Sequence, residues 1–139
     1  MVLHFTGKND KLITDKFLSQ FERMEKGEIE HWRDFHYGRL AYILIADQFS
    51  RAMLRGTARA FSMDKNAFEI SMSILDDPEK KKYYRNHEFT FIILPVMHNE
   101  NVKSIDRVIL ELDEGIKRCS ESGYMNFRGM YEFYKIFAV

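Results

Sequence analysis

The stretch GRLAYILIADQFSRAMLRGTARAFSMD, residues 38–64, contains the strongest signals for both fold and site in this chain. It opens with an apolar run over 40–46, and polar residues then follow at helical spacing. Residues three or four positions apart lie on the same face of a helix. The polar residues that share this face are Asp47, Gln48, Arg51 and Arg55. A helix that begins apolar and then becomes polar on one face offers a place where a binding site can form.

Outward from this stretch, apolar residues recur at intervals of three and four, a pattern typical of amphipathic helices. Gly27 is a natural residue to end a first helix, Asp64 a good N-cap for a third, and Pro78 a favoured first residue for a fourth. The helices are expected near residues 9–26, 37–54, 64–76, 78–97, 101–121 and 125–137. The apolar run 89–93 leaves a buried strand open as the alternative to helix. We therefore predict an all-α, antiparallel helical array in a single domain, residues 1–139.

Composition excludes several classes of function. The 139 residues carry 21 basic and 21 acidic side chains, so no net field favours a nucleic-acid or membrane partner. Cys119 is the single cysteine, which excludes an internal disulfide or a cysteine-based zinc site and suits a reducing compartment. The longest apolar runs, 40–46 and 89–97, are shorter than the ~18 residues that a membrane helix needs. We expect a cytoplasmic protein that binds neither nucleic acid nor membrane, and the composition leaves a homo-oligomer open.

The arginines of the central stretch suggest an anion site. Arg51 and Arg55 are like charges at i and i+4, an arrangement that destabilises an isolated helix unless another group offsets it. Arg59 extends the basic character beyond this pair. Guanidinium groups bind carboxylates and phosphates through paired N–H donors, so an anionic ligand is one interpretation. The alternative is an internal ion-pair network with carboxylates of the same chain, for which the candidates are Asp47, Asp64 and Glu100.

A second candidate site is the sequence His98-Asn99-Glu100, which follows the apolar fourth helix. His98 and Glu100 could supply general acid–base catalysis. They could equally serve as a partner of a helix dipole and as a first-turn acid of the next helix. The segment Glu28-x-x-His31 matches half of a di-iron signature, but the chain has no second such pair, so we predict no metal site. Nucleophile motifs and a glycine-rich phosphate loop are absent from the sequence, so no cofactor is predicted.

Residues 44–64 resemble a block of a bacterial family catalogued as domain of unknown function 924. In that family the block combines a leucine-rich helix, Asp-Gln-Phe-Pro-Arg-Asn, Arg-Gly-Thr, Arg-Ala-Phe and an Asp. The matching residues here are Asp47, Gln48, Phe49, Arg51, Arg55, Gly56, Thr57, Arg59, Ala60, Phe61 and Asp64. Matches upstream are Gly27-Glu28, Trp32 and Gly38-Arg39-Leu40-Ala41, and those downstream are Phe91, Leu94, Pro95, Met97, His98 and Glu100. The resemblance covers about residues 12–112.

The resemblance implies an all-α fold similar to that of tetratricopeptide proteins, and it places the polar block near the His–Glu pair. We therefore expect one pocket to hold Arg51 and Arg55 together with Asp47, Gln48, His98 and Glu100. Arg51 should lie within about one Debye length, ~10 Å, of His98. The resemblance implies no reaction, because the family is uncharacterised.

The chain also departs from the family pattern. Ser50 and Ala52 replace the family's Pro and Asn, and Asn99 replaces its Ser. The family's distal block, rich in His and Arg, has no counterpart after Tyr131. If that block completes a site, the site is either lost here or uses Tyr131 or Tyr134 in its place.

Three classes of function compete. The first is a helical binding module for a small anionic molecule or an acidic peptide. The predicted ligand-binding residues of this module are Asp47, Gln48, Arg51, Arg55 and Arg59. The second is a hydrolase or transferase of an anionic substrate, with His98 as base, Glu100 as a further candidate and the arginines holding the substrate. The third is a structural or oligomerising protein. Binding ranks first, because the sequence shows no nucleophile, metal set or cofactor loop.

Overall fold

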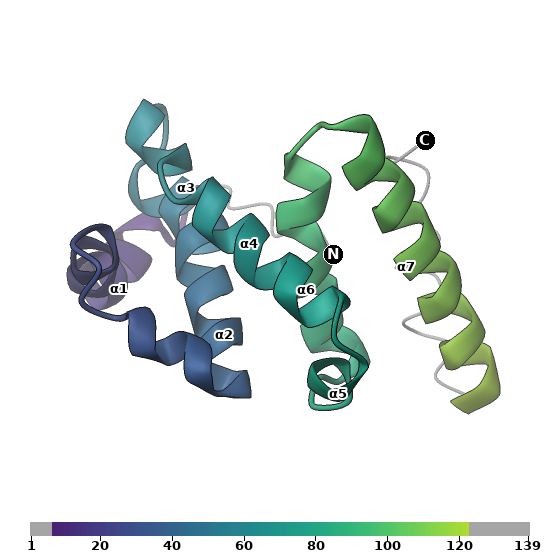
Figure 1. Cartoon of the computed structure of the whole chain (residues 1–139). Coiled ribbons are helices and arrows are strands. Elements are labelled where there is room, and N and C mark those ends of the chain that lie inside the picture. Colours follow the sequence, from purple (N-terminus) through teal and green to yellow (C-terminus); the bar gives the residue numbers. More distant parts are fainter. Residues whose placement is uncertain (1–6, 123–139) are drawn as a thin grey trace.

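The structure is a computed structural model that describes residues 7–122, and every regular element in that range is a helix (Figure 1). The longer helices are α1 (Asp10–Glu25), α2 (His36–Ile43), α4 (Asp64–Leu75), α6 (Asn86–His98) and α7 (Val102–Ser122). The shorter elements are η1 (Glu30–Asp34), η2 (Leu44–Phe49), α3 (Ser50–Met53), η3 (Ala58–Phe61) and α5 (Pro78–Lys81). The all-α prediction is confirmed, and the strand alternative at 89–93 is wrong because that run lies inside α6. The helix predicted at 125–137 lies outside the described residues.

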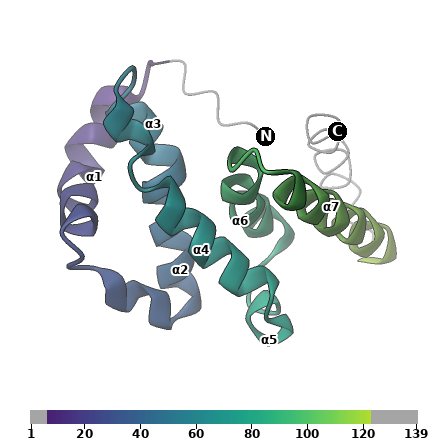
Figure 2. The same ribbon diagram turned by 45° about the horizontal axis from the view of Figure 1, so that its top comes forward.

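The helices form an array with α1 and α7 at opposite edges and α2, α4 and α6 between them (Figures 1 and 2). Helix α6 contacts α2, α4 and α7, so it lies at the centre of the packing. The apolar side chains that meet there are fully buried, and they include Phe21, Tyr42, Ile43, Phe89, Ile92, Ile93 and Leu112. Burial of this apolar surface is the dominant force that holds the array together. The likeness to tetratricopeptide proteins stays a prediction.

The helix predicted over 37–54 is interrupted by a π-helical turn. Elements α2, η2 and α3 follow one another without a loop, and η2 is the π-helical part. Such turns are rare and occur often at functional sites. Segment η2 contacts α1, α4 and α6, so the residues that it carries are surrounded by helices. Its position explains why Asp47 is fully buried.

The helix ends within one residue of the predicted residue 54, so Arg55 lies beyond it and not on the same face as Arg51. Helix α3 stops at Met53, where Leu54 leaves helical geometry with φ −122°. Gly56 then takes φ +79°, a left-handed conformation that glycine adopts readily. The prediction that Arg55 stacks on Arg51 along one helix is therefore wrong.

Two helix starts differ from expectation. Asp64 is the first residue of α4 but not its cap, because its carboxylate pairs with Arg51. The helix predicted over 78–97 is split into α5 and α6. Asp77 does cap α5, since its Oδ1 accepts from the backbone N–H groups of Glu79 at 2.9 Å and Lys80 at 3.4 Å. Helix α6 then carries Pro95 in its last turns and ends at His98, beside the start of α4.

The start of α2 requires a glycine. A Cβ atom on Gly38 would lie 2.1 Å from the backbone oxygen of Trp32 and 2.9 Å from the ring of Phe35. No side chain fits at that separation, because the nearest atom belongs to the backbone. The close approach lets η1 fold back on α2 and seats the half-buried Trp32 against the core.

Candidate functional site

Asp47 is a fully buried carboxylate on η2 with partners from two other segments of the chain. Its Oδ1 lies 2.8 Å from Nδ1 of His98, at the end of α6. Its Oδ2 accepts a hydrogen bond from Nε2 of Gln48 at 2.7 Å, and Nη1 of Arg51 lies 3.6 Å from Oδ1. A buried charge is tolerated only when it is paired and hydrogen-bonded, and these contacts meet that requirement.

Arg51 is bound mainly to groups of its own chain. Its Nη1 and Nη2 donate to the two carboxylate oxygens of Asp64 at 3.0 Å each, a bidentate pair. Nη1 also donates to the backbone oxygen of Asp47 at 2.5 Å. The guanidinium carbon lies 5.1 Å from the ring centre of Phe61, a cation–π contact. The guanidinium fork is therefore occupied by protein acceptors before any ligand arrives.

The ring of His98 is oriented by Asp47. Nδ1 lies 2.8 Å from the Asp47 carboxylate but 3.3 Å from Nη2 of Arg51. An unprotonated Nδ1 would place its lone pair against a carboxylate oxygen, so the favoured tautomer carries the proton on Nδ1 and donates it to Asp47. In the neutral imidazole Nε2 then carries the lone pair, and among the described residues it has no hydrogen-bond partner. We call Asp47, Gln48, Arg51, Asp64 and His98 the Asp47 network.

A pocket of about 250 Å³ opens beside His98. It lies between the first turns of α4 and the last turns of α6 and is lined by Asp64, Lys65, Phe68, Pro95, His98 and Asn99. Phe68 and Pro95 supply apolar wall, and the other residues supply polar groups. The side chain of His98 is 34% exposed, so the ring joins the buried carboxylate of Asp47 to this open space. We call this space the His98 pocket.

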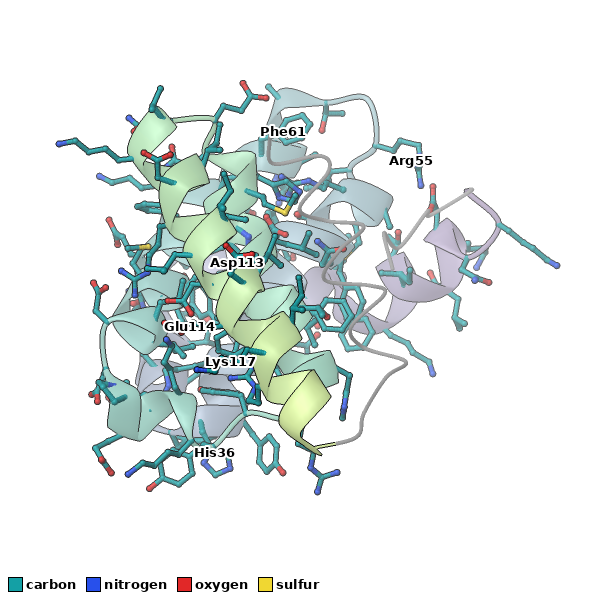
Figure 3. All side chains as sticks on the ribbon, turned by 90° about the vertical axis from the view of Figure 1, so that its right-hand side faces the viewer. His36, Arg55, Phe61, Asp113, Glu114 and Lys117 are labelled. Atoms are coloured by element: carbon teal, nitrogen blue, oxygen red, sulfur yellow. The ribbon has the colours of Figure 1, made fainter. Side chains whose placement is uncertain are left out.

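Arg55 and Arg59 lie apart from the Asp47 network. Arg55 donates to both oxygens of Asp10 at 2.8 and 3.0 Å, and Arg59 donates to Glu25 at 3.0 and 2.5 Å. Both acids belong to α1, and we call these contacts the α1 ion pairs. In Figure 3, Arg55 lies on the side of α1, well separated from Phe61, whose ring covers Arg51.

The α1 ion pairs shift the titration of their acids. The hydrogen bond from Arg55 lowers the pKa of Asp10 below its ordinary 3.8, and the bond from Arg59 lowers the pKa of Glu25 below its ordinary 4.5. Both arginines are therefore bound to surface carboxylates. The prediction that Arg55 shares one pocket with Asp47 and His98 is wrong, because the chain turns away after α3.

Glu100 is also outside the network. It is exposed and follows the C-cap of α6 with φ +53°, a left-handed conformation that is uncommon for residues other than glycine. Within residues 7–122, no hydrogen bond or ion pair joins its side chain to the Asp47 network. Its place in the structure is that of a helix-terminating residue, for which glycine is usual.

Sequence reasoning placed Asp47, Gln48 and Arg51 together and expected His98 nearby, and the structure shows this proximity. It missed the other residues that line the His98 pocket, namely Lys65, Phe68, Pro95 and Asn99. The signal that could have drawn attention to two of them is adjacency, since Lys65 follows Asp64 and Asn99 follows His98. Nothing in the sequence places the start of α4 against the end of α6.

The described residues contain no group of three or more His, Cys, Asp or Glu side chains that could hold a metal ion. They also include no helix both long enough and apolar enough to span a membrane.

Together these features define a class of protein: an all-helical domain in which a π-helical turn buries an aspartate against a histidine and an arginine. The model of a family described as bacterial protein of unknown function, DUF924, matches residues 3–136, and the chain belongs to this family. No curated protein matches the chain.

One solved structure shares the fold. A protein of unknown function from Agrobacterium tumefaciens superimposes with a TM-score of 0.68 at 20% sequence identity. The match covers 93% of this chain and 68% of that chain. At this identity the likeness supports the fold alone.

Proposed function

We propose that the His98 pocket is the active site of a hydrolase or transferase in which His98 acts as general base. One observation carries this proposal: Nδ1 of His98 is bound to the buried Asp47, while Nε2 is left without a partner among the described residues beside an open pocket. An imidazole oriented by a carboxylate through one nitrogen can remove a proton from a substrate or a water through the other.

The rest of the Asp47 network supports the same role. Gln48 and Arg51 hold the Asp47 carboxylate from two further directions, and Arg51 is itself fixed by Asp64. A base is most effective when its orientation is set before the substrate binds. The burial of Asp47 supplies such an arrangement, since the carboxylate is closed off from solvent.

The binding module that ranked first from the sequence has less support. It relied on Arg51, Arg55 and Arg59, and each of these guanidinium groups already pairs with a carboxylate of the chain. A small anion would have to displace a bidentate internal partner at each of them. One observation keeps the module as the second candidate: Lys65 lines the pocket with its side chain 86% exposed, so its ammonium can reach a ligand.

The tautomer of His98 tests the basis of the proposal without a substrate. In ¹⁵N-correlated NMR spectra of the neutral imidazole, we expect the proton on Nδ1 and the lone pair on Nε2. Asp47→Asn should change this distribution, because the amide no longer requires a donor at Nδ1. A proton on Nε2 in the wild type would contradict the assignment of His98 as a base toward the pocket.

Turnover tests the function itself. We would measure hydrolysis of a panel of 4-nitrophenyl esters, covering phosphate and carboxylate esters, by the wild type, His98→Gln and the surface control His31→Gln. Removal of a general base typically lowers the rate about 10²–10⁴-fold. We expect that loss in His98→Gln and wild-type rates in His31→Gln, since His31 is exposed on η1. Equal rates in all three proteins would show that any hydrolysis seen does not use His98.

A further inference from the structure

When His98 is neutral, the ionised groups of the Asp47 network do not balance. Asp47 and Asp64 are two carboxylates, and both interact with the one guanidinium of Arg51. With a neutral His98, these three groups sum to one negative charge. A network of this kind favours a ligand that brings a positive charge to the open side, and Asp64 is the acid on that side because it lines the pocket.

Asp64 retains acceptor capacity toward the pocket. A carboxylate offers about four lone-pair sites, and Arg51 takes one on each oxygen. The side chain of Asp64 is 32% exposed, so the remaining lone pairs are accessible. Because Arg51 holds both oxygens, the carboxylate is fixed in orientation and can receive an ammonium group without reorganisation.

Lys65 places the opposite charge at the same pocket. It follows Asp64 in the first turn of α4, and both side chains line the space. Its Nζ is 4.0 Å from Glu69, a weak contact for an exposed ion pair, so the ammonium is available to a carboxylate. Phe68 and Pro95 complete the lining with apolar surface. The pocket thus combines a fixed carboxylate, an available ammonium group and an apolar wall.

We propose that the His98 pocket binds small zwitterions of the α-amino-acid class, with the ammonium group on Asp64, the carboxylate on Lys65 and an apolar side chain against Phe68 and Pro95. A volume of about 250 Å³ suits a molecule of that size, since drug-sized ligands occupy pockets of roughly 300–1,000 Å³. This inference rests on the proposed function, because it names the substrate class of the same site.

Three matched compounds test the assignment by isothermal titration calorimetry. L-leucine carries both charges, isopentylamine lacks the carboxylate, and 4-methylpentanoate lacks the ammonium. We expect L-leucine to bind the wild type more tightly than either analogue by about tenfold or more, because each analogue loses one charged contact. Equal affinity for all three, or no binding of L-leucine at about 10 mM, would overturn the zwitterion assignment.

Two variants assign each contact to its side chain. Lys65→Met should lower the affinity for L-leucine to that of isopentylamine. The side chain is exposed, so the substitution should leave the fold intact. Asp64→Asn keeps the shape and should remove the advantage of L-leucine over 4-methylpentanoate. Lys103→Met serves as control, because Lys103 is exposed on α7 and lies outside the pocket lining. If neither pocket variant changes L-leucine affinity, the compound binds elsewhere and the assignment fails.

The result of the L-leucine binding test can be told apart from the result of the turnover test. Calorimetry reads the binding of L-leucine and the ester panel reads His98-dependent turnover, so the two proposals have separate readouts. Binding without any His98-dependent turnover would contradict the enzyme but keep the ligand class. His98-dependent turnover without L-leucine binding would contradict the ligand class but keep the enzyme.

Discussion

Arg51 and Arg55 are four residues apart, yet they belong to two different electrostatic regions. Arg51 lies in the Asp47 network, where it interacts with two carboxylates, one of them fully buried. Arg55 is half exposed and pairs with Asp10 at the surface. The exposed pair is screened by solvent, whereas the network holds a buried carboxylate beside an open pocket. Residue type alone therefore does not show which arginine lies at the candidate site; its burial and the identity of its partners do.

The largest effect on the free energy of unfolding is expected from Asp47→Ala. Removing the acid leaves His98 and Gln48 without their shared carboxylate partner and takes one of two carboxylates from Arg51. Loss of one member of a buried pair costs about 3–5 kcal/mol. Urea unfolding followed by circular dichroism measures the loss. Asp47→Asn is the matched control, because it keeps the volume and part of the hydrogen bonding. If Asp47→Ala cost no more than Asp10→Ala, the distinction between the two regions would disappear.

Asp64→Ala should have a smaller effect. Arg51 loses both of its bidentate bonds but keeps the backbone oxygen and the carboxylate of Asp47. Because the partly buried guanidinium of Arg51 then lacks two of its acceptors, we expect a loss of about 1–3 kcal/mol in the free energy of unfolding. Lys65→Ala, one residue along the same helix, should leave stability almost unchanged because its side chain is exposed. Equal losses of stability in Asp64→Ala and Lys65→Ala would mean that the bidentate pair does not stabilise the fold.

Glu100→Gly tests whether Glu100 lies outside the Asp47 network. A residue with a side chain pays about 1 kcal/mol for a left-handed conformation, so we expect the glycine variant to be more stable by up to that amount. His98-dependent turnover should be unchanged, since the side chain of Glu100 has no contact with the network among the described residues. A variant that gained stability but lost turnover would show that Glu100 belongs to the candidate site.

The pair of Arg55 with Asp10 should show a weak coupling. A double-mutant cycle of Arg55→Gln and Asp10→Asn, measured by denaturant midpoints, isolates the interaction from the effect of each side chain. We expect the coupling to vanish at about 1 M NaCl, where the Debye length falls to roughly 3 Å. A coupling that survived this salt concentration would indicate that the α1 ion pairs are as shielded from solvent as the Asp47 network.

The smallest effect concerns acid pH. The pKa values of Asp10 and Glu25 are lowered in the folded state, so above their ordinary values of 3.8 and 4.5 the α1 ion pairs stabilise the fold. This contribution is lost as the pH falls through the lowered values, because the unfolded chain then binds more protons. In Arg55→Gln and Arg59→Gln, the decline of stability below about pH 4.5 should be shallower than in the wild type. If stability declined equally steeply at acid pH in the variants and the wild type, these pairs would not be formed in solution.

The helical class follows from local sequence, because apolar spacing and helix caps are properties of neighbouring residues. Asp77 and Pro78 start α5, Gly27 follows α1 with φ +75°, and the run 89–93 is helical as its length and context favoured. Asp47, Gln48 and Arg51 were placed together for the same reason, since residues three or four positions apart meet on any helix.

Which of these groups form a site depends instead on how the helices pack. His98 reaches Asp47 across 51 positions because α6 packs on η2, and the pocket exists because the start of α4 lies beside the end of α6. Asp64 became the partner of Arg51 rather than a cap, and Arg55 went to the surface when α3 ended at Met53. Contacts of this kind depend on how whole helices bury their apolar faces, and that arrangement is a property of the packed chain rather than of any local pattern.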